Sequence, residues 1–475
     1  MKKVIFFLLT VFTVAGWTAA QGTYEASLPS AKSIVRVWHG DEMVIYNHDS
    51  GGKGQFILWS NGATVGQLFD LPYVNAEVLD FEILEDTVMF CGVYSNPAFP
   101  GAGTCGFVGR FEISSAFAGA GPVEFTALIN WINLPYGAPT EAIFIRNLKR
   151  IDVFKNDTVG AVAALIGDSY VYTDRMYERV SVLSAYRMSP IHWQVYSTVP
   201  KDGRKVFTDI AVLDDMVVAA GHGISNTHCI TRAYHKTYAF PSNPFVNFWF
   251  DSIYTAGYTP VDDVLAAHVE GNVMALAQFN TRPRTILHVL EFNTVTGHPT
   301  QFTSSRVTDI HGCNTVTCPW RLDGLRYSPT NNTLHILERG MLPGDVTMNS
   351  LLWTFPLMYG GEPTAYVQKV KGLTQTSLDV DIDDHPVTSG IVDATGQLDI
   401  HTFAPGGAFI PLPSSPTVPV FDIYDNCTYN TEDIISTPTV TIGLEGVDRI
   451  SIDHTPENRM FVPNVHEIIF DNICK

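Results

Sequence analysis

An aspartate with apolar or small neighbours recurs in this chain, near the start of one strand-like segment in seven of eight repeats. Only the first repeat, around Lys32-Ser33-Ile34, lacks it. The series consists of Asp80, Asp152, Asp209, Asp263, Asp323, Asp379 and Asp448. If the repeats surround one axis, these carboxylates form a ring at the mouth of a channel. Such a ring gains from a bound Ca²⁺ or an ammonium group, because clustered carboxylates repel one another.

A second interpretation of the series is structural. A carboxylate can accept backbone N–H groups from a neighbouring segment and so fix the packing of adjacent repeats. A residue that returns in nearly every repeat follows the architecture, whereas a binding site usually breaks the symmetry. We therefore expect the members without a distinctive neighbourhood to be structural: Asp80, Asp209, Asp263, Asp379 and Asp448.

Features that break the symmetry are better candidates for a binding site. The segment from His311 to Arg321 contains Cys313 and Cys318, and a disulfide there would hold Trp320 and Arg321 beside Asp323. An insertion carrying Tyr136 and Glu141 precedes Asp152 in the same way. The predicted binding residues are therefore Trp320, Arg321, Asp323, Tyr136, Glu141 and Asp152.

No complete catalytic or metal-binding motif is present in the sequence. The patterns G-x-S-x-G, H-E-x-x-H and Walker A are absent. The segment Asp379–Asp384 resembles a calcium loop but lacks the glycine at its sixth position and the glutamate at its twelfth. We predict no catalytic residue and no cofactor, with a Ca²⁺ at the channel mouth as the alternative.

A turn built on Asp or Asn marks each repeat, between an extended segment and an apolar strand. It recurs at intervals of about 60 residues. The turn residues are Asp41, Asp86, Asp157, Asp215, Asn272, Asn332, Asp384 and Asn458. Asp and Asn suit this position because their side chains bond the turn backbone and tolerate positive φ.

The segments that follow each turn alternate apolar and polar residues, as in Val180–Arg187 and Thr285–Phe292. Four such strands in each repeat predict an all-β fold, a single β-propeller over residues 21–475 with eight four-stranded blades, or alternatively seven. The last repeat has room for three strands only. We expect the mature N-terminal segment Thr23–Leu28 to supply the fourth and close the ring, the alternative being a disordered N-terminus.

Residues 1–20 are typical of a secretory signal peptide, with Lys2-Lys3, an apolar run from Val4 to Val14 and a small-residue exit. The sequence therefore predicts a secreted, cell-surface or periplasmic protein without a membrane span. A net charge of −19 with no basic cluster argues against a nucleic acid partner.

An exported chain can form disulfides. Its seven cysteines could pair as Cys91 with Cys105, Cys313 with Cys318, and Cys427 with Cys474, which leaves Cys229 over. Buried free thiols are the alternative.

The phrase D-(T/M)-V-x-x-x-G after the turn, as in Asp86–Gly92, accompanies the signal peptide and the irregular repeats. In these features the chain resembles secreted propeller-like proteins of Bacteroides-type bacteria. The resemblance implies a propeller fold and no defined activity. We expect a non-catalytic secreted protein that binds a protein or glycan through its decorated rim. The alternative is a polysaccharide-directed hydrolase or lyase that uses rim carboxylates.

Overall fold

The computed structural model describes most of the chain from residue 22 to residue 403, and short segments beyond it. The described residues are 22–40, 42–60, 63–72, 75–95, 103–119, 124–127, 132–133, 142–173, 176–188, 191–200, 205–223, 228–238, 249–255, 261–280, 284–295, 297, 299–306, 321–340, 349–357, 366–370, 373–403, 410–411, 422–424, 451–453, 459–462 and 466–469.

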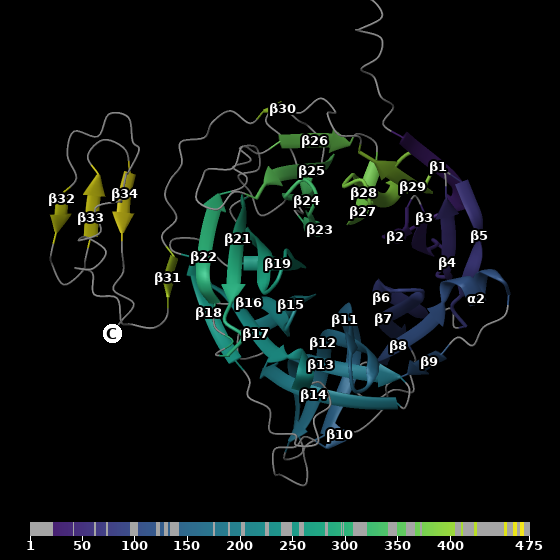
Figure 1. The fold of residues 1–475 in the computed structure, drawn as a ribbon, viewed down its shortest axis with the longest axis horizontal. Coiled ribbons are helices and arrows are strands. Elements are labelled where there is room, and N and C mark those ends of the chain that lie inside the picture. Colours follow the sequence, from purple (N-terminus) through teal and green to yellow (C-terminus); the bar gives the residue numbers. More distant parts are fainter. Residues whose placement is uncertain are drawn as a thin grey trace, which may run out of the picture.

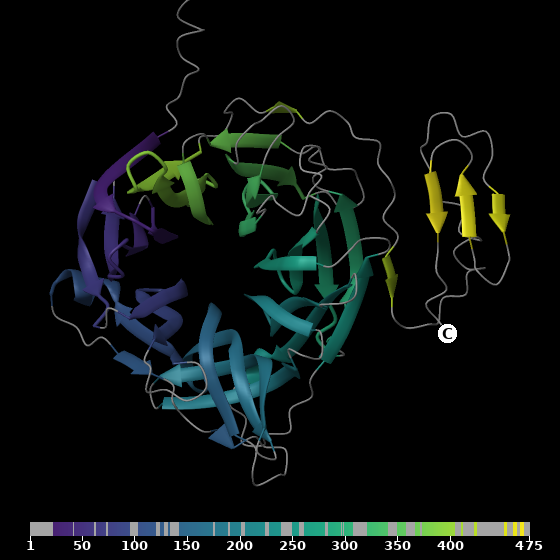
Figure 2. The same ribbon diagram turned by 180° about the vertical axis from the view of Figure 1, so that it is seen from behind.

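The described residues are almost entirely strands, so the prediction of an all-β chain is confirmed. The helical elements among them are a short helix α2 (Ile113–Phe117) and a 3₁₀ turn η1 (Lys236–Tyr238). Seven sheets of four or five antiparallel strands surround a central opening in a propeller-like arrangement (Figure 1). Figure 2 shows the same opening from the other side.

The seven sheets are numbered here in chain order. Sheet 1 contains β2 (Lys32–His39), β3 (Glu42–His48), β4 (Gly54–Ser60) and β5 (Ala63–Asp70). Sheet 2 contains β6 (Ala76–Leu84), β7 (Thr87–Ser95), β8 (Thr104–Glu112) and β9 (Glu124–Ala127). Sheet 3 contains β10 (Ile132–Asn133), β11 (Ala142–Asn156), β12 (Gly160–Thr173), β13 (Met176–Met188) and β14 (Ile191–Pro200).

The remaining sheets follow the same pattern. Sheet 4 contains β15 (Lys205–Val212), β16 (Met216–Gly223), β17 (His228–His235), β18 (Trp249–Thr255) and β31 (Asp422–Tyr424). Sheet 5 contains β19 (Val261–His268), β20 (Val273–Asn280), β21 (Arg284–Phe292) and β22 (Pro299–Arg306). Sheet 6 contains β23 (Arg321–Ser328), β24 (Thr333–Gly340), β25 (Asn349–Pro356), β26 (Tyr366–Val370) and β30 (Ile410–Pro411). Sheet 7 contains β27 (Leu373–Val380), β28 (Pro386–Val392), β29 (Gln397–Thr402) and β1 (Gly22–Pro29).

The predicted turns lie between β2 and β3, β6 and β7, β11 and β12, β15 and β16, β19 and β20, β23 and β24, and β27 and β28, as expected. Backbone with positive φ occurs at several of them, at Asn332 with φ 49° and Asp384 with φ 63°. Both residue types tolerate this conformation better than β-branched ones do. The Asp/Asn turn is therefore a reliable marker of the innermost hairpin.

The hydrophobic core is divided among the contacts between neighbouring sheets. Tyr46 and Phe56 of sheet 1, for example, pack with Phe81 and Phe90 of sheet 2. Separate clusters lie between each following pair, and one joins Val35 and Ile45 of sheet 1 to strands β28 and β29 of sheet 7. The strand next to the innermost one lies between two such clusters. Its side chains are therefore mostly apolar on both faces.

The N-terminal strand does complete a sheet, but not the one that the sequence suggested. β1 pairs with β29, with Tyr24 opposite Ile400, and so forms the outer strand of sheet 7. It does not pair with the last repeat. That repeat forms a separate three-stranded sheet, β32 (Ser451–Asp453), β33 (Arg459–Val462) and β34 (His466–Ile469), which lies to one side of the seven sheets in Figure 1.

The proline-rich stretch from Ala404 to Asn430 is described only at β30 and β31. These two short strands add to the outer edges of β26 and β18.

Removal of β1 should weaken sheet 7. We expect a chain that starts at Ala31 to unfold at lower urea concentration than one that starts at Gln21, by roughly 2–4 kcal/mol, because several cross-strand hydrogen bonds to β29 are lost. The exposed β29 edge should also promote self-association. Equal urea midpoints for the two chains, with equal elution volumes in gel filtration, would show that β1 does not secure this sheet.

Candidate functional site

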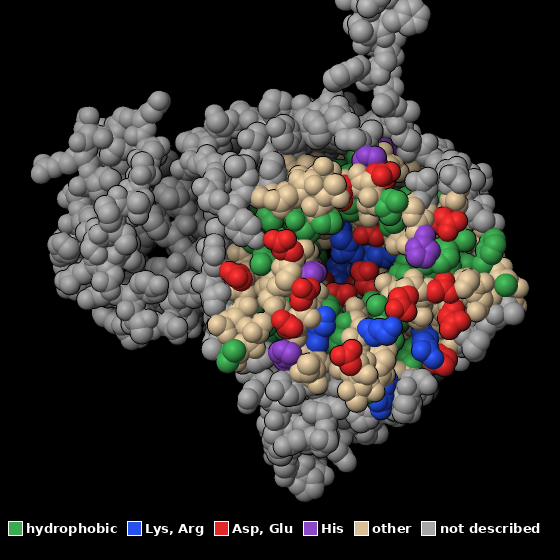
Figure 3. Space-filling view, in the orientation of Figure 1, with side chains coloured by type: hydrophobic (Ala, Val, Ile, Leu, Met, Phe, Trp, Pro, Cys, Tyr) green, Lys and Arg blue, Asp and Glu red, His purple; other side chains and the backbone are tan. Residues whose placement is uncertain are grey.

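A pocket of about 420 Å³ lies on the central axis, lined by one strand from each of the seven sheets: β2, β6, β11, β15, β19, β23 and β27. These innermost strands contact one another in chain order, and β27 contacts β2. Figure 3 shows acidic and basic side chains gathered in this central hollow. The pocket is therefore polar and charged, unlike the apolar layers between the sheets.

Local backbone geometry turns the charged residues toward the pocket. Each of the seven innermost strands has a register shift near its pocket-lining residues, for example between Val78 and Asp80 in β6 and between Phe207 and Asp209 in β15. An extra residue in one strand re-aims the side chains that follow it. On β7, the neighbour of the bulged strand β6, the residue that faces the bulge is Gly92. A Cβ atom at Gly92 would lie 2.0 Å from the carbonyl oxygen of Glu77. Any larger residue there would force the two strands apart.

Four aspartates of the predicted series accept a backbone N–H from the next sheet. The bonds run from Ile151 to Asp80 (3.2 Å), Val212 to Asp152 (2.6 Å), Ala266 to Asp209 (2.8 Å) and Val37 to Asp379 (2.7 Å). The first three also accept the N–H of the residue that follows them. We call these contacts the aspartate clamps. Each of the four carboxylates is thus tied to the backbone of the neighbouring sheet, including Asp152, which the sequence analysis placed among the binding residues.

The other members of the series are described less fully. Asp323 lines the pocket and Asp263 lies on β19, where only its backbone pairing with Phe279 is described. Asp448 lies outside the described residues.

The first repeat, which lacks the aspartate, contributes an arginine instead. Arg36 of β2 is almost fully buried, with 8% of its side chain exposed. Its Nη2 donates to Asp80 (2.7 Å) and its Nε to Glu82 (2.8 Å), both on β6. Its Nη1 donates to the carbonyl of Val35 (2.8 Å). All three guanidinium nitrogens are therefore used, and Arg36 joins sheets 1 and 2.

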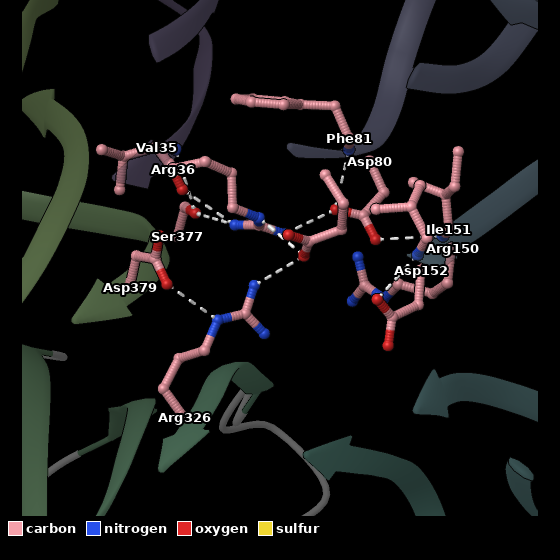
Figure 4. Close-up of polar contacts among 12 residues, drawn as sticks. Val35, Arg36, Asp80, Phe81, Arg150, Ile151, Asp152, Arg326, Ser377 and Asp379 are labelled. Atoms are coloured by element: carbon pink, nitrogen blue, oxygen red, sulfur yellow. Dashed lines mark hydrogen bonds and ion pairs between the residues drawn. The ribbon is translucent and has the colours of Figure 1, made fainter. Parts of the chain in front are cut away.

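A second arginine extends this network across the axis. Arg326 of β23 donates from Nη2 to the same Glu82 oxygen (2.9 Å) and from Nε to Asp379 (3.1 Å). Figure 4 shows Arg36 and Arg326 converging from two strands, with Arg150 and Asp152 reaching in from β11 on the other side. Glu82 therefore connects sheet 2 to sheet 1, its neighbour, and to sheet 6, which is not adjacent to it in the ring order.

A third arginine forms a longer contact. The Nε atom of Arg150 lies 3.6 Å from Asp209, and 31% of the Arg150 side chain is exposed. Asp152, two residues further along the same strand, forms no ion pair with any described Lys or Arg. Its hydrogen bonds come from backbone N–H groups.

Burial shifts the acid–base equilibria of these groups. It raises the pKa of Glu82 to about 7, although Arg36 and Arg326 act in the opposite direction. It raises the pKa of Asp152 to about 6, against the backbone bonds from Val212 and Val153. Burial opposes the charge of Arg326, but Glu82 and Asp379 raise its pKa. The pocket thus concentrates negative charge that its arginines balance only in part.

The residues predicted for the rim are mostly not described. Trp320, Tyr136 and Glu141 lie outside the described residues, and Arg321 begins β23 with its side chain undescribed. Asp152 and Asp323 do line the pocket. Sequence reasoning missed Arg36, Glu82, Arg150 and Arg326. A signal for two of them was available, because Glu82 lies two residues from Asp80 and Arg150 two residues from Asp152, on the pocket face of their strands.

The predicted disulfide between Cys91 and Cys105 is wrong. Both are buried thiols, and Cys91 lies opposite Val108 while Cys105 lies opposite Tyr94. Burial raises the pKa of Cys105 to about 12 and that of Cys91 as well, so both are inert thiols rather than nucleophiles. No group of three His, Cys, Asp or Glu in the described part of the chain is arranged to hold a metal.

The aspartate clamps predict a specific loss. Replacing Asp209 with alanine should leave the Ala266 N–H without its acceptor and destabilise the fold by about 1–3 kcal/mol. Urea unfolding and hydrogen exchange at the Ala266 amide would measure this. Asp157→Ala, in the exposed turn of sheet 3, is the matched control. Unchanged exchange at Ala266 would contradict the clamp.

Glu82 should make stability depend on pH. A carboxyl whose pKa is raised on folding stabilises the fold at low pH, and this contribution is lost as pH rises from about 4.5 to about 7. Burial also lowers the pKa of three histidines, His288, His335 and His401, to about 4. Their effect on the free energy of unfolding is opposite to that of Glu82, because a histidine held neutral makes the fold more stable as the pH rises. The difference between the wild type and Glu82→Gln therefore isolates the glutamate.

We expect the stability of the wild type relative to Glu82→Gln to fall by about 2 kcal/mol between pH 5 and pH 8. Urea unfolding at pH 5, 6, 7 and 8 provides the measurement. Glu270→Gln, in an exposed turn, should follow the wild type at every pH. A constant difference between wild type and Glu82→Gln across this range would contradict the raised pKa.

No helix among the described residues has the length and apolar character needed to cross a membrane. A scan against protein-family models finds no match, and a search of curated proteins finds none.

Several solved structures share the arrangement of sheets at low sequence identity, and they are β-propeller proteins. The β-propeller domain of Cps50 (Swd1) from Myceliophteria thermophila has a TM-score of 0.44 and 10% identity, covering 81% of this chain and 98% of that chain. The periplasmic gluconolactonase PpgL of Pseudomonas aeruginosa has a TM-score of 0.45 and 11% identity, covering 82% and 100%. BBS1N, solved in complex with ARL6DN, has a TM-score of 0.40 and 10% identity, covering 82% and 99%.

Proposed function

We propose that this protein is a secreted, non-catalytic β-propeller of seven blades that binds a protein or glycan partner at the mouth of its central pocket. The observation that carries the proposal is that the carboxylates of the pocket are held by hydrogen bonds and ion pairs from the protein itself. Asp80, Asp152, Asp209 and Asp379 are engaged by backbone N–H groups of two strands or by an arginine, and Glu82 by two arginines. Groups held in this way build a rigid scaffold for recognition.

Seven blades fit the described sheets better than eight. The seven interface clusters include one between sheets 1 and 7, and β1 completes the outer edge of sheet 7. The sheet of β32–β34 pairs with none of the seven. In this proposal the last repeat is an appendage to the propeller rather than an eighth blade. Secretion is proposed from the Lys2-Lys3 start and the apolar run that follows it.

The partner contacts are proposed at the rim that leads into the pocket. Trp320 and Arg321 precede Asp323, and Tyr136 and Glu141 precede the strand that carries Asp152. Aromatic and arginine side chains contribute most to binding energy in many interfaces. Trp320 and Arg321 lie within three residues of the pocket-lining Asp323 in the chain, which supports a contact surface that continues from the rim into the pocket.

A second function is favoured by one specific observation. Burial raises the pKa of Glu82 to about 7, and a carboxyl that retains its proton near neutral pH can act as a general acid. A polysaccharide-directed hydrolase or lyase would need such a group. The two arginines that share Glu82 count against this role, because a proton donor must be able to turn toward its substrate.

Binding and catalysis are separated by two measurements on the same variants. We expect capture of a defined partner, on a glycan array or in binding assays with purified secreted proteins, to fall about tenfold or more in Trp320→Ala. Phe117→Ala, an exposed aromatic on the helix α2, is the matched control and should bind as the wild type does. Release of reducing or unsaturated sugar ends from a polysaccharide panel should be absent in all proteins. Turnover that drops about a hundredfold or more in Glu82→Gln would overturn the proposal in favour of an enzyme.

A further inference from the structure

The charges of the central pocket do not balance. Three guanidinium groups, Arg36, Arg150 and Arg326, form ion pairs with Asp80, Glu82 and Asp209 of the pocket wall and with Asp379 beside it. Lys32, a fourth cation on the wall, pairs with Glu77. Two further carboxylates, Asp152 and Asp323, line the pocket. No described Lys or Arg lies within ion-pair distance of Asp152, so its charge has no ion-pair partner in the described part of the fold.

Asp152 is fixed in place and still has acceptor capacity. Its Oδ1 accepts the N–H of Val153 (2.8 Å) and its Oδ2 the N–H of Val212 (2.6 Å). A carboxylate offers about four lone-pair sites, so two backbone bonds leave room for further donors. Because both bonds come from strand backbone, the carboxylate keeps one orientation when a ligand arrives. This is the condition for a preorganised anchor.

We propose that Asp152 is the anchor of a binding site for a cationic nitrogen group, an ammonium or a guanidinium, which the partner inserts into the central pocket. This inference rests on the proposed binding function and names the chemistry that the partner presents. The pocket of about 420 Å³ has room for the end of a basic side chain or a small amine. Tyr327, which also lines the pocket, adds an aromatic surface for such a group.

The same geometry disfavours two other ligand classes. A small metal ion needs several oxygen ligands that converge on one point. In the described residues each clamped carboxylate is instead tied to a different pair of strands, and no metal-binding group is formed. An anion would meet arginines already paired with carboxylates, and the excess negative charge would repel it. A nitrogen cation needs only one charged acceptor and hydrogen-bond acceptors around it.

The test begins with the wild-type protein, so that it does not depend on a variant that folds. Butylammonium and methylguanidinium chloride are titrated and followed by NMR at the Val153 and Val212 amides, which bond directly to Asp152. Butanol is the neutral control and calcium chloride the metal arm. We expect saturable shifts at these two amides with both cations and none with butanol. Equal shifts with butanol, no shift with either cation, or displacement of butylammonium by lower concentrations of Ca²⁺ would each overturn the proposal.

Variants of Asp152 then test whether binding of the cations depends on its negative charge. Asp152→Asn should weaken binding of both cations by about tenfold or more, whereas Asp152→Glu, which keeps the charge, should recover part of it. Asp157→Asn makes the same change in the exposed turn of the same hairpin and should bind as the wild type does. Binding that is unchanged in folded Asp152→Asn would overturn the assignment.

Failure of this inference can be told apart from failure of the proposed function. If a partner is captured equally by wild type and Asp152→Asn, the cationic anchor is wrong while the binding function stands. If no partner is captured and a polysaccharide is turned over, the binding function itself is wrong.

Discussion

The carboxylate that accepts a backbone N–H from the neighbouring sheet is the interaction on which the central pocket depends. A β-strand at the inner edge of a sheet has unpaired N–H groups, and leaving them buried without an acceptor costs about 1–3 kcal/mol each. Asp80, Asp152, Asp209 and Asp379 supply those acceptors from the adjacent strand. The clamps therefore satisfy the backbone and set the spacing of the innermost strands at once.

The clamps also place several carboxylates close to the central axis, where their negative charges repel one another. The repulsion is reduced by Arg36, Arg150 and Arg326, each from a different sheet. Arg36 lies in the repeat that lacks the aspartate. This repeat therefore contributes a cation to the pocket where the others contribute an anion, and Arg36 donates hydrogen bonds to both Asp80 and Glu82.

The sequence predicted the elements well where a local rule applies. Asp and Asn turns fixed the innermost hairpins, and period-two alternation gave the strands. The recurrence of the aspartates in the repeats predicted carboxylates at equivalent positions on the innermost strands, and four of them accept a backbone N–H from the next sheet. The partners of Arg36 and Arg326 could not be predicted, because Glu82 and Arg326 are 244 residues apart and meet only when the sheets surround one axis. The prediction that the N-terminal strand joins the last repeat was wrong for a related reason. The sequence shows that a repeat has room for three strands only, but it does not show which sheet has an open edge. β1 pairs with β29 of sheet 7 instead.

Stability and recognition share the same side chains in this pocket. Glu82 joins sheets 1, 2 and 6 through two arginines, so its charge both ties the innermost strands together and contributes to the potential that a ligand meets. Asp152 combines the two roles in another way. Its bonds from Val153 and Val212 stabilise the innermost strands, while no described Lys or Arg forms an ion pair with its charge. The same backbone bonds that hold the strands together therefore also hold this carboxylate in the orientation in which a cation would meet it.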